Sequence, residues 1–527
     1  MPTLNWIGKD KVVTHHQDVP FRVLDKKYSF GDTTDSGNMV IHGDNLEALK
    51  ALLPEYEGRI KCIYIDPPYN TGNEGWVYND NVNDPHIRKW LGQVVGSEFD
   101  DLTRHDKWLC MMYPRLVLLH KLLSENGVIF ISIDDNEQAN LKLLCNEIFG
   151  STNFIAQVIW ERAYAPVNLK KHFSESHDFI LCYAKDIDHC VCNGLVRSAE
   201  ANDRYSNPDN DPRGPWKAAD CTVGPAVEEK LYELTLPSGR VVTPAKGRCW
   251  LYTRERLDEM ISDNRIWFGP KGDSVPAVKK FLSEVKQGIT PMTIWKYTEV
   301  GHSQDATKQL KNIFGGQSVF TYPKSVELVK RCIQLYSDKD SIILDSFAGS
   351  GTTAQAILEL NKQDNGLRKF ILVELSDYAD NVTAERVRRV MSGYGEGKNA
   401  VEGTGGSFDF YELGETIFDP VSGNLNDNAA TEQIRRYVWF SETNSAYVAP
   451  SKDAHPFLLG SYQHNNYYFF YIKGEETCLD WDFLNTFTER DRAEMYIIYA
   501  DRCVLTPEEM LKHNIVFKKI PRDIKRV

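Results

Sequence analysis

The segment 341–374 restricts the fold of this chain more than any other part of the sequence. Residues 341–345 (Ser-Ile-Ile-Leu-Asp) form an apolar, β-branched run of the kind found in buried strands. A glycine-containing loop follows at 346–353, then a helical pattern, then a second apolar run at 370–373 that ends in Glu374. Strand, loop, helix and strand in this order predict a βαβ unit, and therefore an α/β fold with parallel strands.

The residues of this unit suit a nucleoside ligand. Gly349 and Gly351 let the backbone approach a ligand closely at the start of a helix. Glu374 ends the second strand, where a carboxylate can accept hydrogen bonds from two ribose hydroxyls. No Gly-x-x-x-x-Gly-Lys-Ser/Thr motif occurs in the chain, so a nucleoside-cofactor site is expected rather than a nucleotide phosphate loop of that type.

A second motif lies near the N-terminus, where the apolar run 60–65 ends abruptly at Asp66, Pro67, Pro68 and Tyr69. In open α/β sheets, ligands bind at the carboxyl ends of the strands. An exocyclic amino group of a nucleobase is a poor nucleophile because its lone pair is delocalised into the ring. A carboxylate and a rigidly held carbonyl can each accept one of its N–H groups, and Tyr69 offers a face for stacking. A Pro-Pro turn with an incidental Asp and Tyr is the structural alternative.

Together the two motifs resemble those of the DNA amino-methyltransferases. In that family a Phe-x-Gly-x-Gly loop holds S-adenosylmethionine and an (Asp/Asn/Ser)-Pro-Pro-(Tyr/Phe/Trp) loop holds the target base. Here the Asp-Pro-Pro-Tyr loop comes first and the glycine loop about 280 residues later, as in the circularly permuted β subclass. The string 66–73 (Asp-Pro-Pro-Tyr-Asn-Thr-Gly-Asn) is closer still to the modification subunits of type III restriction systems. The resemblance covers most of residues 38–395.

The resemblance implies a Rossmann-like S-adenosylmethionine-dependent methyltransferase sheet, circularly permuted, with an inserted target-recognition region and a C-terminal α+β domain. We expect the following parts: an N-terminal extension (1–37), the first catalytic part (38–185), the target-recognition insertion (186–315), the second catalytic part (316–395), a linker (396–407) and a C-terminal domain for dimer or partner contacts (408–527).

The resemblance also suggests which residues act. The catalytic set is Asp66, Pro67, Pro68 and Tyr69. The cofactor set comprises the end of the 40–44 strand, a Tyr-Pro-Lys element and the glycine loop with its acid: Asp44, Tyr322, Lys324, Asp345, Phe347, Gly349, Ser350, Gly351, Thr352 and Glu374. Asp44 also reads as an ordinary helix N-cap, with Glu47 completing a capping box, and both roles can hold together.

DNA contacts are expected from the insertion and from one motif beside the base pocket. Arginine and lysine residues alternate there with tryptophan and other aromatics, which suits groove and backbone contacts; the candidates are Arg213, Lys217 and Arg248. A solvated insertion with a small aromatic core is the alternative. His177, in the motif 170–183, is a candidate contact to the extruded nucleotide, or else a strand-edge histidine. The loop 70–84, rich in Asn, Gly and Asp, is expected to close over the base.

Charge and composition constrain the partners. The net charge is −13, which argues against a generic nucleic-acid binder. Residues 161–330 contain 24 Lys and Arg against 22 Asp and Glu, so 24 − 22 = +2 in this segment and −15 in the remainder. The 11 cysteines form no Cys-x-x-Cys pair, so reduced thiols and no metal are expected. With no signal peptide or long apolar run, we expect a cytoplasmic protein without membrane contact.

The expected function is site-specific methylation of adenine N6 in double-stranded DNA, with S-adenosylmethionine as the cofactor and the base flipped from the duplex. Transfer would be direct, since the Pro-Cys dipeptide of cytosine-C5 enzymes is absent. Asp66 in place of Ser favours adenine by family tendency. Cytosine-N4 methylation, a catalytically silent DNA-specificity or assembly subunit, and an RNA or protein amino-methyltransferase are the alternatives. Expected partners are a second copy of the chain and a separate restriction subunit with ATPase and nuclease activity.

Overall fold

The computed structural model describes residues 3–32, 36–71, 92, 103–166, 171–195, 203–284, 288–419, 422–488 and 491–524. The chain divides into two compact units, one formed by Met1–Cys192 with Met292–Val527 and the other by Asn193–Pro291. Most of the loop predicted to close over the base, residues 72–84, and Lys170 of the predicted base-pocket motif lie outside the described residues. Within the described part of the chain, no helix is both long and apolar enough to cross a membrane.

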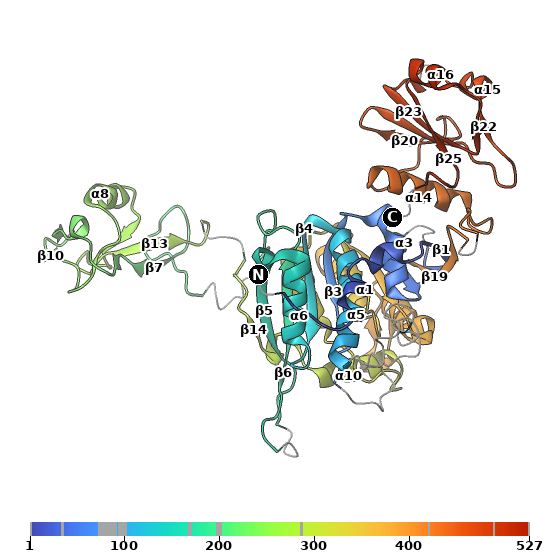
Figure 1. The fold of residues 1–527 in the computed structure, drawn as a ribbon. Coiled ribbons are helices and arrows are strands. Elements are labelled where there is room, and N and C mark those ends of the chain that lie inside the picture. Colours follow the sequence, from blue (N-terminus) through green and yellow to red (C-terminus); the bar gives the residue numbers. More distant parts are fainter. Residues whose placement is uncertain are drawn as a thin grey trace. The chain divides into compact units, whose positions relative to one another are not determined.

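The large unit is built on a ten-stranded mixed sheet (Figure 1). Its strands run in the order β1 (Arg22–Phe30), β19 (Phe408–Thr416), β2 (Met39–His42), β16 (Lys369–Glu374), β15 (Ile342–Asp345), β3 (Ile60–Ile65), β4 (Leu123–Ile133), β6 (His177–Ala184), β5 (Phe154–Glu161) and β14 (Ile294–Trp295). The predicted α/β class is confirmed.

The centre of the sheet is parallel, and its chain order reverses between two neighbouring strands. β15 pairs in parallel with β16 on one side and with β3 on the other. From β15 the chain continues outward to β16, whereas from β3 it continues outward in the opposite direction to β4. Ligands of doubly wound sheets bind at such a reversal, beyond the carboxyl ends of the strands. Both sequence motifs begin there, at Asp66 and Asp345.

Helices cover both faces of this sheet. One layer consists of α1 (Lys9–Val12), α2 (His15–Asp18), α3 (Asn45–Tyr56), α5 (Arg104–Leu122) and α6 (Gln138–Cys145); the other consists of α9 (Tyr297–Val300), α10 (Ser303–Ile313), α11 (Val326–Tyr336), α12 (Thr352–Asp364) and α13 (Glu385–Ser392). Strand residues alternate between the layers, so Ile63 and Ile65 enter the core with α3 and α5. A Thr103–Asp106 capping box starts α5.

Two segments outside the expected catalytic parts, one before residue 38 and one after residue 407, add strands to this sheet. The sheet therefore extends beyond the expected boundaries. β19 pairs in parallel with β2 and antiparallel with β1, so segments expected in the N-terminal extension and the C-terminal domain extend the catalytic sheet. The expected linker is also tied down: the short strands β17 (Gly393–Tyr394) and β18 (Val401–Glu402) pair, and the amide of Thr404 donates to the carbonyl of Val390 at 3.0 Å. A deletion from residue 408 would therefore remove a catalytic-sheet strand.

The C-terminal segment has the predicted α+β composition. A four-stranded sheet in the order β20 (Leu458–Tyr462), β21 (Asn465–Phe469), β23 (Met495–Ala500) and β25 (Ile515–Lys519) packs beside α14 (Thr431–Thr443). The shorter elements are β22 (Cys478–Leu479), α15 (Trp481–Leu484), β24 (Arg502–Cys503) and α16 (Pro507–Lys512). Phe440 of α14 reaches the core of the large sheet, and the amide of Tyr447 donates to the carbonyl of Pro54 at 2.8 Å. These contacts tie the segment to α3.

The second unit is a small β-rich body with one α-helix among its described residues. Its main sheet has the order β12 (Ile266–Trp267), β13 (Ala277–Phe281) and β7 (Trp216–Asp220). Two further pairs of short strands are β8 (Thr222–Val223) with β11 (Cys249–Trp250) and β9 (Leu234–Thr235) with β10 (Val241–Val242). The helix α8 (Arg254–Ser262) belongs to the same unit. The unit ends at Pro291, whereas the expected insertion ran to 315. β14 explains the difference, because Ile294 and Trp295 pair with β5 of the large sheet.

Candidate active site

The Asp-Pro-Pro-Tyr loop leaves the sheet at the carboxyl end of β3 and meets Lys324, which precedes α11. The Lys324 Nζ atom lies 2.7 Å from Oδ2 of Asp66 and 4.8 Å from the centre of the Tyr69 ring. The other carboxylate oxygen of Asp66, Oδ1, is buried and has no hydrogen-bond partner among the described residues. One loop therefore presents a carboxylate and an aromatic ring, and an ammonium group contacts both.

Helix α5 and the neighbouring strand end hold this loop in position. The indole nitrogen of Trp108 donates to the Pro68 carbonyl at 2.6 Å. Asn70 adopts a left-handed backbone conformation (φ 57°), which Asn tolerates better than most residues. Its side-chain amide donates to the buried carboxylate of Glu137 at 2.5 Å. These contacts leave few ways for Asp66 and Tyr69 to reorient independently of the loop.

Asp178 also belongs to this site, although the sequence analysis singled out its neighbour His177. Successive residues of a strand face opposite sides of the sheet. In β6 this places Asp178 beside the loop, where its Oδ2 atom is 3.5 Å from the Tyr69 hydroxyl. His177 instead packs edge-on against the ring of Phe179. Burial raises the pKa of Asp178 to about 6, while Lys324 and Arg162, the latter at 2.7 Å, oppose the shift.

We expect activity to fall as the pH is lowered through about 6, because protonated Asp178 no longer pairs with Arg162. Folding raises this pKa from 3.8, so the folded state takes up a proton between these values. The Asp178 contribution to the free energy of unfolding therefore decreases as the pH rises through that window. The measurement is single-turnover rate against pH for wild type and Asp178→Asn. An unchanged acid limb in the variant would rule out this assignment.

The glycine loop joins β15 to α12, and its conformation needs glycine. Gly349 and Gly351 both have positive φ, at 51° and 79°. Glu374, at the end of the adjacent β16, accepts a hydrogen bond from the Gly349 amide at 2.8 Å and one from the Ser376 amide at 3.0 Å. Burial raises the pKa of Glu374, and these bonds to its ionised form act against that shift. Glu374 is thus hydrogen-bonded directly to the glycine loop.

Asp345 lies under the same loop and stabilises its first turn. Its carboxylate accepts hydrogen bonds from the Phe347 amide at 3.0 Å and the Thr353 hydroxyl at 2.5 Å. Burial raises the pKa of Asp345 to about 7. The hydroxyl of Ser346 is buried without a hydrogen-bond partner among the described residues. Phe347 packs partly against the main core.

A comparison of the sequence with protein families covers the residues of this site. The sequence profile described as DNA methylase, the N6_N4_Mtase family, matches residues 60–385, which is more than half of the chain. The chain belongs to the DNA methylase family. The matched region starts at β3 with the Asp-Pro-Pro-Tyr loop and extends past the glycine loop and Glu374 into α13.

Named relatives of this methylase include type III Mod subunits and type II methyltransferases. The chain is 34% identical over 395 residues to the type III restriction-modification enzyme StyLTI Mod subunit of Salmonella typhimurium, covering 72% of this chain and 59% of that one. It is 33% identical to the EcoPI Mod subunit of Escherichia phage P1, covering 71% and 63%. It is 32% identical to the type II methyltransferase M.KpnI of Klebsiella pneumoniae, covering 67% and 84%. The chain thus spans about three fifths of the Mod subunits' length.

A solved structure, the PvuII DNA methyltransferase (cytosine-N4-specific), aligns at 11% identity and a TM-score of 0.34 over 66% of this chain and 86% of that one. The fold assignment above rests on the strand order of the methylase itself.

Two buried arginines of the methylase support the cofactor-side loops, and no sequence motif pointed to them. Arg386 of α13 donates to the hydroxyls of Ser350 and Thr352, each at 2.8 Å. Burial lowers the pKa of Arg386 to about 10. Ser350 and Thr352, expected to contact the cofactor, therefore use their side chains to anchor the glycine loop on α13. The sequence signal that could have identified Arg386 is an arginine on an otherwise apolar face of a helix.

Arg115 plays the matching part at the end of β2. Its Nε atom donates to the Asn45 side chain at 2.5 Å, and its guanidinium lies 3.2 Å from Asp44. Asp44 also caps α3 by accepting from the Leu46 amide at 2.7 Å, so the N-cap is confirmed. The expected capping box is not formed, because the Glu47 carboxylate instead bonds Arg22 at 2.9 Å. Asn45 in turn donates to the Ser346 carbonyl at 2.8 Å. This chain of contacts fixes Asp44 beside the glycine loop, where a cofactor role stays a prediction.

Tyr322 and Lys324, of the expected Tyr-Pro-Lys element, have different surroundings in the structure. Lys324 pairs with Asp66 in the catalytic loop rather than standing on the glycine-loop side. The Tyr322 side chain is 54% exposed. The ion pair with Asp66 gives Lys324 a contact other than the cofactor contact that the resemblance implied, which stays a prediction.

Two of the three DNA-binding candidates in the small unit have internal structural roles. Arg213 bonds the buried carboxylate of Asp211 at 2.9 Å and that of Asp263 at 3.1 Å. Arg248 bonds Asp220 at 2.7 Å and the Thr222 hydroxyl at 2.9 Å. The third, Lys217, is exposed on β7 and lies against the ring of Tyr205. Of these three candidates, only Lys217 forms no ion pair with a described residue.

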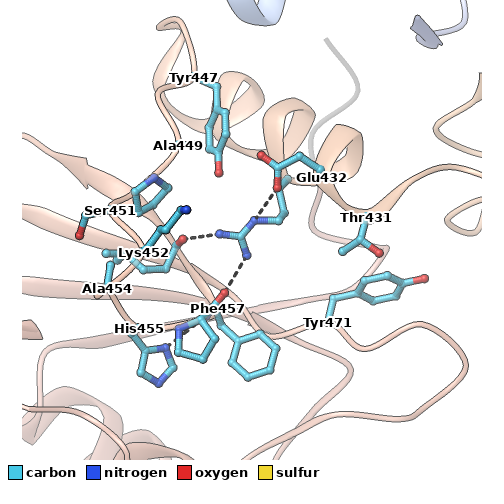
Figure 2. Close-up of a pocket in the computed structure, with 14 residues that line it drawn as sticks. Thr431, Glu432, Tyr447, Ala449, Ser451, Lys452, Ala454, His455, Phe457 and Tyr471 are labelled. Carbon is cyan, nitrogen blue, oxygen red and sulfur yellow. Dashed lines mark hydrogen bonds and ion pairs between the residues drawn. The ribbon is translucent and has the colours of Figure 1, made fainter. Parts of the chain in front are cut away.

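A cavity of about 410 Å³ lies in the C-terminal segment (Figure 2). Its central cation, Arg435, is fully engaged: it lies 3.5 Å from Glu432 and donates to the carbonyls of Pro456 and Leu458. His455 on the rim bonds the Thr486 hydroxyl at 2.9 Å. The side chains of Arg435 and His455 therefore stabilise the segment itself.

A stability prediction follows from the glycine loop. A Cβ atom on Gly351 would lie 3.0 Å from the Thr383 carbonyl oxygen at a φ of 79°, whereas a Cβ on Gly397 meets nothing within 4 Å at a similar φ of 56°. Both alanines carry the left-handed strain of about 1 kcal/mol, but only Gly351→Ala adds a backbone collision. We expect Gly351→Ala to lower the thermal midpoint and cofactor affinity, and Gly397→Ala to lower the midpoint less. Equal effects in calorimetry would contradict the close approach.

Proposed function

We propose that this methylase transfers a methyl group from S-adenosylmethionine to adenine N6 at a specific site in double-stranded DNA. One observation carries the proposal: the Asp66 carboxylate with the Tyr69 ring stands at the end of β3, and the glycine loop stands at the end of the adjacent β15, at the reversal of the sheet. Glu374, at the end of the next strand β16, bonds that loop. An amino group held by Asp66 would thus face a cofactor held by the loop.

The cofactor side fits a nucleoside with a charged tail. The Glu374 carboxylate is positioned by two amides and retains lone pairs for ribose hydroxyls. Ser346 offers a buried hydroxyl with no described partner, and Asp44 a carboxylate at the adjoining strand end. When bound, S-adenosylmethionine would supply an activated methyl group on its sulfonium. The chain needs no nucleophile of its own, because the base nitrogen attacks directly.

The base side fits an exocyclic amino group taken out of the duplex. Asp66 and the Pro67 carbonyl would each accept one N–H, which localises the lone pair on the nitrogen. Tyr69 would stack on the extruded base, an interaction worth roughly 1–3 kcal/mol, which offsets the few kcal/mol that flipping costs. Circular permutation of the methyltransferase sheet is retained as part of this proposal.

The relatives favour a place in a restriction-modification system. Type III Mod subunits match over more than 70% of this chain. We therefore infer that the protein serves as a modification subunit, acts as a homodimer and assembles with a separate restriction subunit that supplies ATPase and nuclease activity. We place it in the cytoplasm.

Cytosine-N4 methylation is the second candidate, since the matched family covers N6 and N4 chemistry. Single-molecule sequencing of DNA from cells expressing this chain alone separates the candidates. N6-methyladenine in one recognition sequence supports the proposal; N4-methylcytosine supports the second candidate. Unmodified DNA would indicate a silent specificity or assembly subunit.

The DNA-binding prediction centres on two lysines. Lys217 of β7 and Lys280 of β13 are directly opposite each other and exposed, and neither forms an ion pair with a described residue. Like charges placed this way repel, and a phosphate between them would relieve the repulsion. We expect the double variant Lys217→Ala, Lys280→Ala to weaken DNA binding and to reduce the salt slope by about 2.

The matched control is Arg213→Ala, which removes an internal ion pair. It should lower the thermal midpoint with little change in salt slope, measured by fluorescence anisotropy at several salt concentrations. A steeper loss of the slope in Arg213→Ala than in the lysine variant would reverse the assignment.

A further inference from the structure

Lys324 contacts both groups that the target base requires. Its ammonium donates to Asp66 Oδ2 at 2.7 Å and lies over the Tyr69 ring at 4.8 Å. An exocyclic amino group held by this loop would do the same two things, since it would donate an N–H to Asp66 and its ring would stack on Tyr69. An ammonium satisfies both because it is an N–H donor and because cations are attracted to aromatic faces.

Lys324 bonds Oδ2 of Asp66 and not the buried Oδ1. Oδ1 is buried, with no partner among the described residues, while the side chain as a whole is 24% exposed. The exposure therefore does not come from Oδ1, and Lys324 is bonded to the other oxygen. The Lys324 side chain is itself only 13% exposed, so it fills the space above the loop rather than extending into solvent.

We propose that Lys324 occupies the place of the target amino group when no base is bound, and that the incoming base displaces it. The inference rests on the proposed function and makes Lys324 a positioning residue of the base pocket, where the resemblance to the family implied a cofactor contact. The ammonium keeps Asp66 paired and oriented in the resting protein. It also competes with the base, so only a base that donates to Asp66 and stacks on Tyr69 replaces both of its contacts.

The surrounding charges favour an ammonium in this position. Asp66 and Asp178 both stand near Lys324, and Lys324 opposes the burial-driven rise in the Asp178 pKa. Arg162 neutralises Asp178 from the other side at 2.7 Å. Departure of Lys324 leaves Asp66 to be satisfied by the base alone, whereas Asp178 keeps Arg162.

Two substitutions should move base extrusion in opposite directions. Lys324→Met keeps the length and apolar stem but removes the competing donor. Lys324→Arg keeps the charge and adds a planar fork that binds carboxylates in two places and stacks on aromatic rings. In duplex DNA with 2-aminopurine beside the target adenine, Lys324→Met should increase the fluorescence that reports base extrusion, and Lys324→Arg should decrease it. Apparent DNA affinity should change in parallel, by roughly threefold or more.

The control is Lys330→Met on α11, whose lysine pairs with Glu327 and Glu359 away from the loop. It should leave extrusion unchanged, and calorimetry should give wild-type affinity for S-adenosylmethionine in all three variants. A decrease in extrusion for both Lys324 variants would overturn the displacement, as would weaker cofactor binding with unchanged extrusion. Methyl incorporation by the wild type, run alongside, tests the proposed function separately: its absence refutes that function, whatever the variants do.

Discussion

Asp66→Ala should reduce methyl transfer by at least about a hundredfold, the scale seen when a group that stabilises reacting charge is removed. The carboxylate is the acceptor proposed to localise the lone pair of the amino group, and the alanine cannot replace it. Cofactor binding should stay within about twofold of wild type, since the glycine loop is held by Asp345, Glu374 and Arg386 rather than by Asp66. Methyl incorporation and calorimetry measure the two quantities.

The control for Asp66→Ala is Asp135→Ala, which removes an exposed carboxylate that follows the neighbouring strand β4. It should methylate at the wild-type rate, because this carboxylate is exposed and has no role in the proposed transfer. Because Asp66→Ala leaves Lys324 without its partner, Asp66→Asn serves as a second variant that keeps an acceptor oxygen. Asp66→Asn should retain more methyl transfer than Asp66→Ala, and wild-type turnover by Asp66→Ala would refute the assignment.

Glu374→Ala should weaken S-adenosylmethionine binding by about 1–3 kcal/mol, the cost of losing a charged hydrogen-bonding group. That corresponds to roughly 5- to 150-fold in the dissociation constant. Two effects combine: the ribose loses its acceptor, and the amides of Gly349 and Ser376 lose theirs, so the loop itself is loosened. Sequence preference on DNA should not change, because Glu374 stands on the cofactor side.

The matched control for Glu374→Ala is Glu402→Ala, a carboxylate whose side chain is 88% exposed and which pairs only with Lys362 among the described residues. An exposed pair of this kind contributes little. Calorimetry should therefore show wild-type cofactor affinity in Glu402→Ala. If Glu374→Ala altered the methylated sequence instead, the division between cofactor and recognition residues would be wrong.

Local patterns were enough to place the two motifs. Asp66 and Asp345 each end a short β-branched run, and a strand that ends in a loop at a sheet edge can be recognised from a few consecutive residues. Glycines at positive φ, as at 349 and 351, are similarly local. The α/β class, the order of the motifs and the cofactor-side acid Glu374 followed from such signals.

Contacts between distant segments could not be obtained in the same way. Lys324 is 258 residues from Asp66, and the choice of Asp178 over His177 depends on which face of β6 meets the loop. Arg213 resembled a DNA-binding residue because the sequence does not reveal that Asp211 and Asp263 already bind it. The sequence alone does not distinguish a charged side chain that is solvated from one that binds a phosphate or pairs with a buried carboxylate.

The sequence by itself determined the family, the α/β class and the residues that open each functional loop, since these depend on short-range spacing and backbone preference. Only the tertiary structure decided that Lys324 lies on Asp66, that Arg386 anchors the glycine loop and that β19 extends the catalytic sheet. The physical reason is that packing brings together groups far apart along the chain, and burial then sets which charges must be paired.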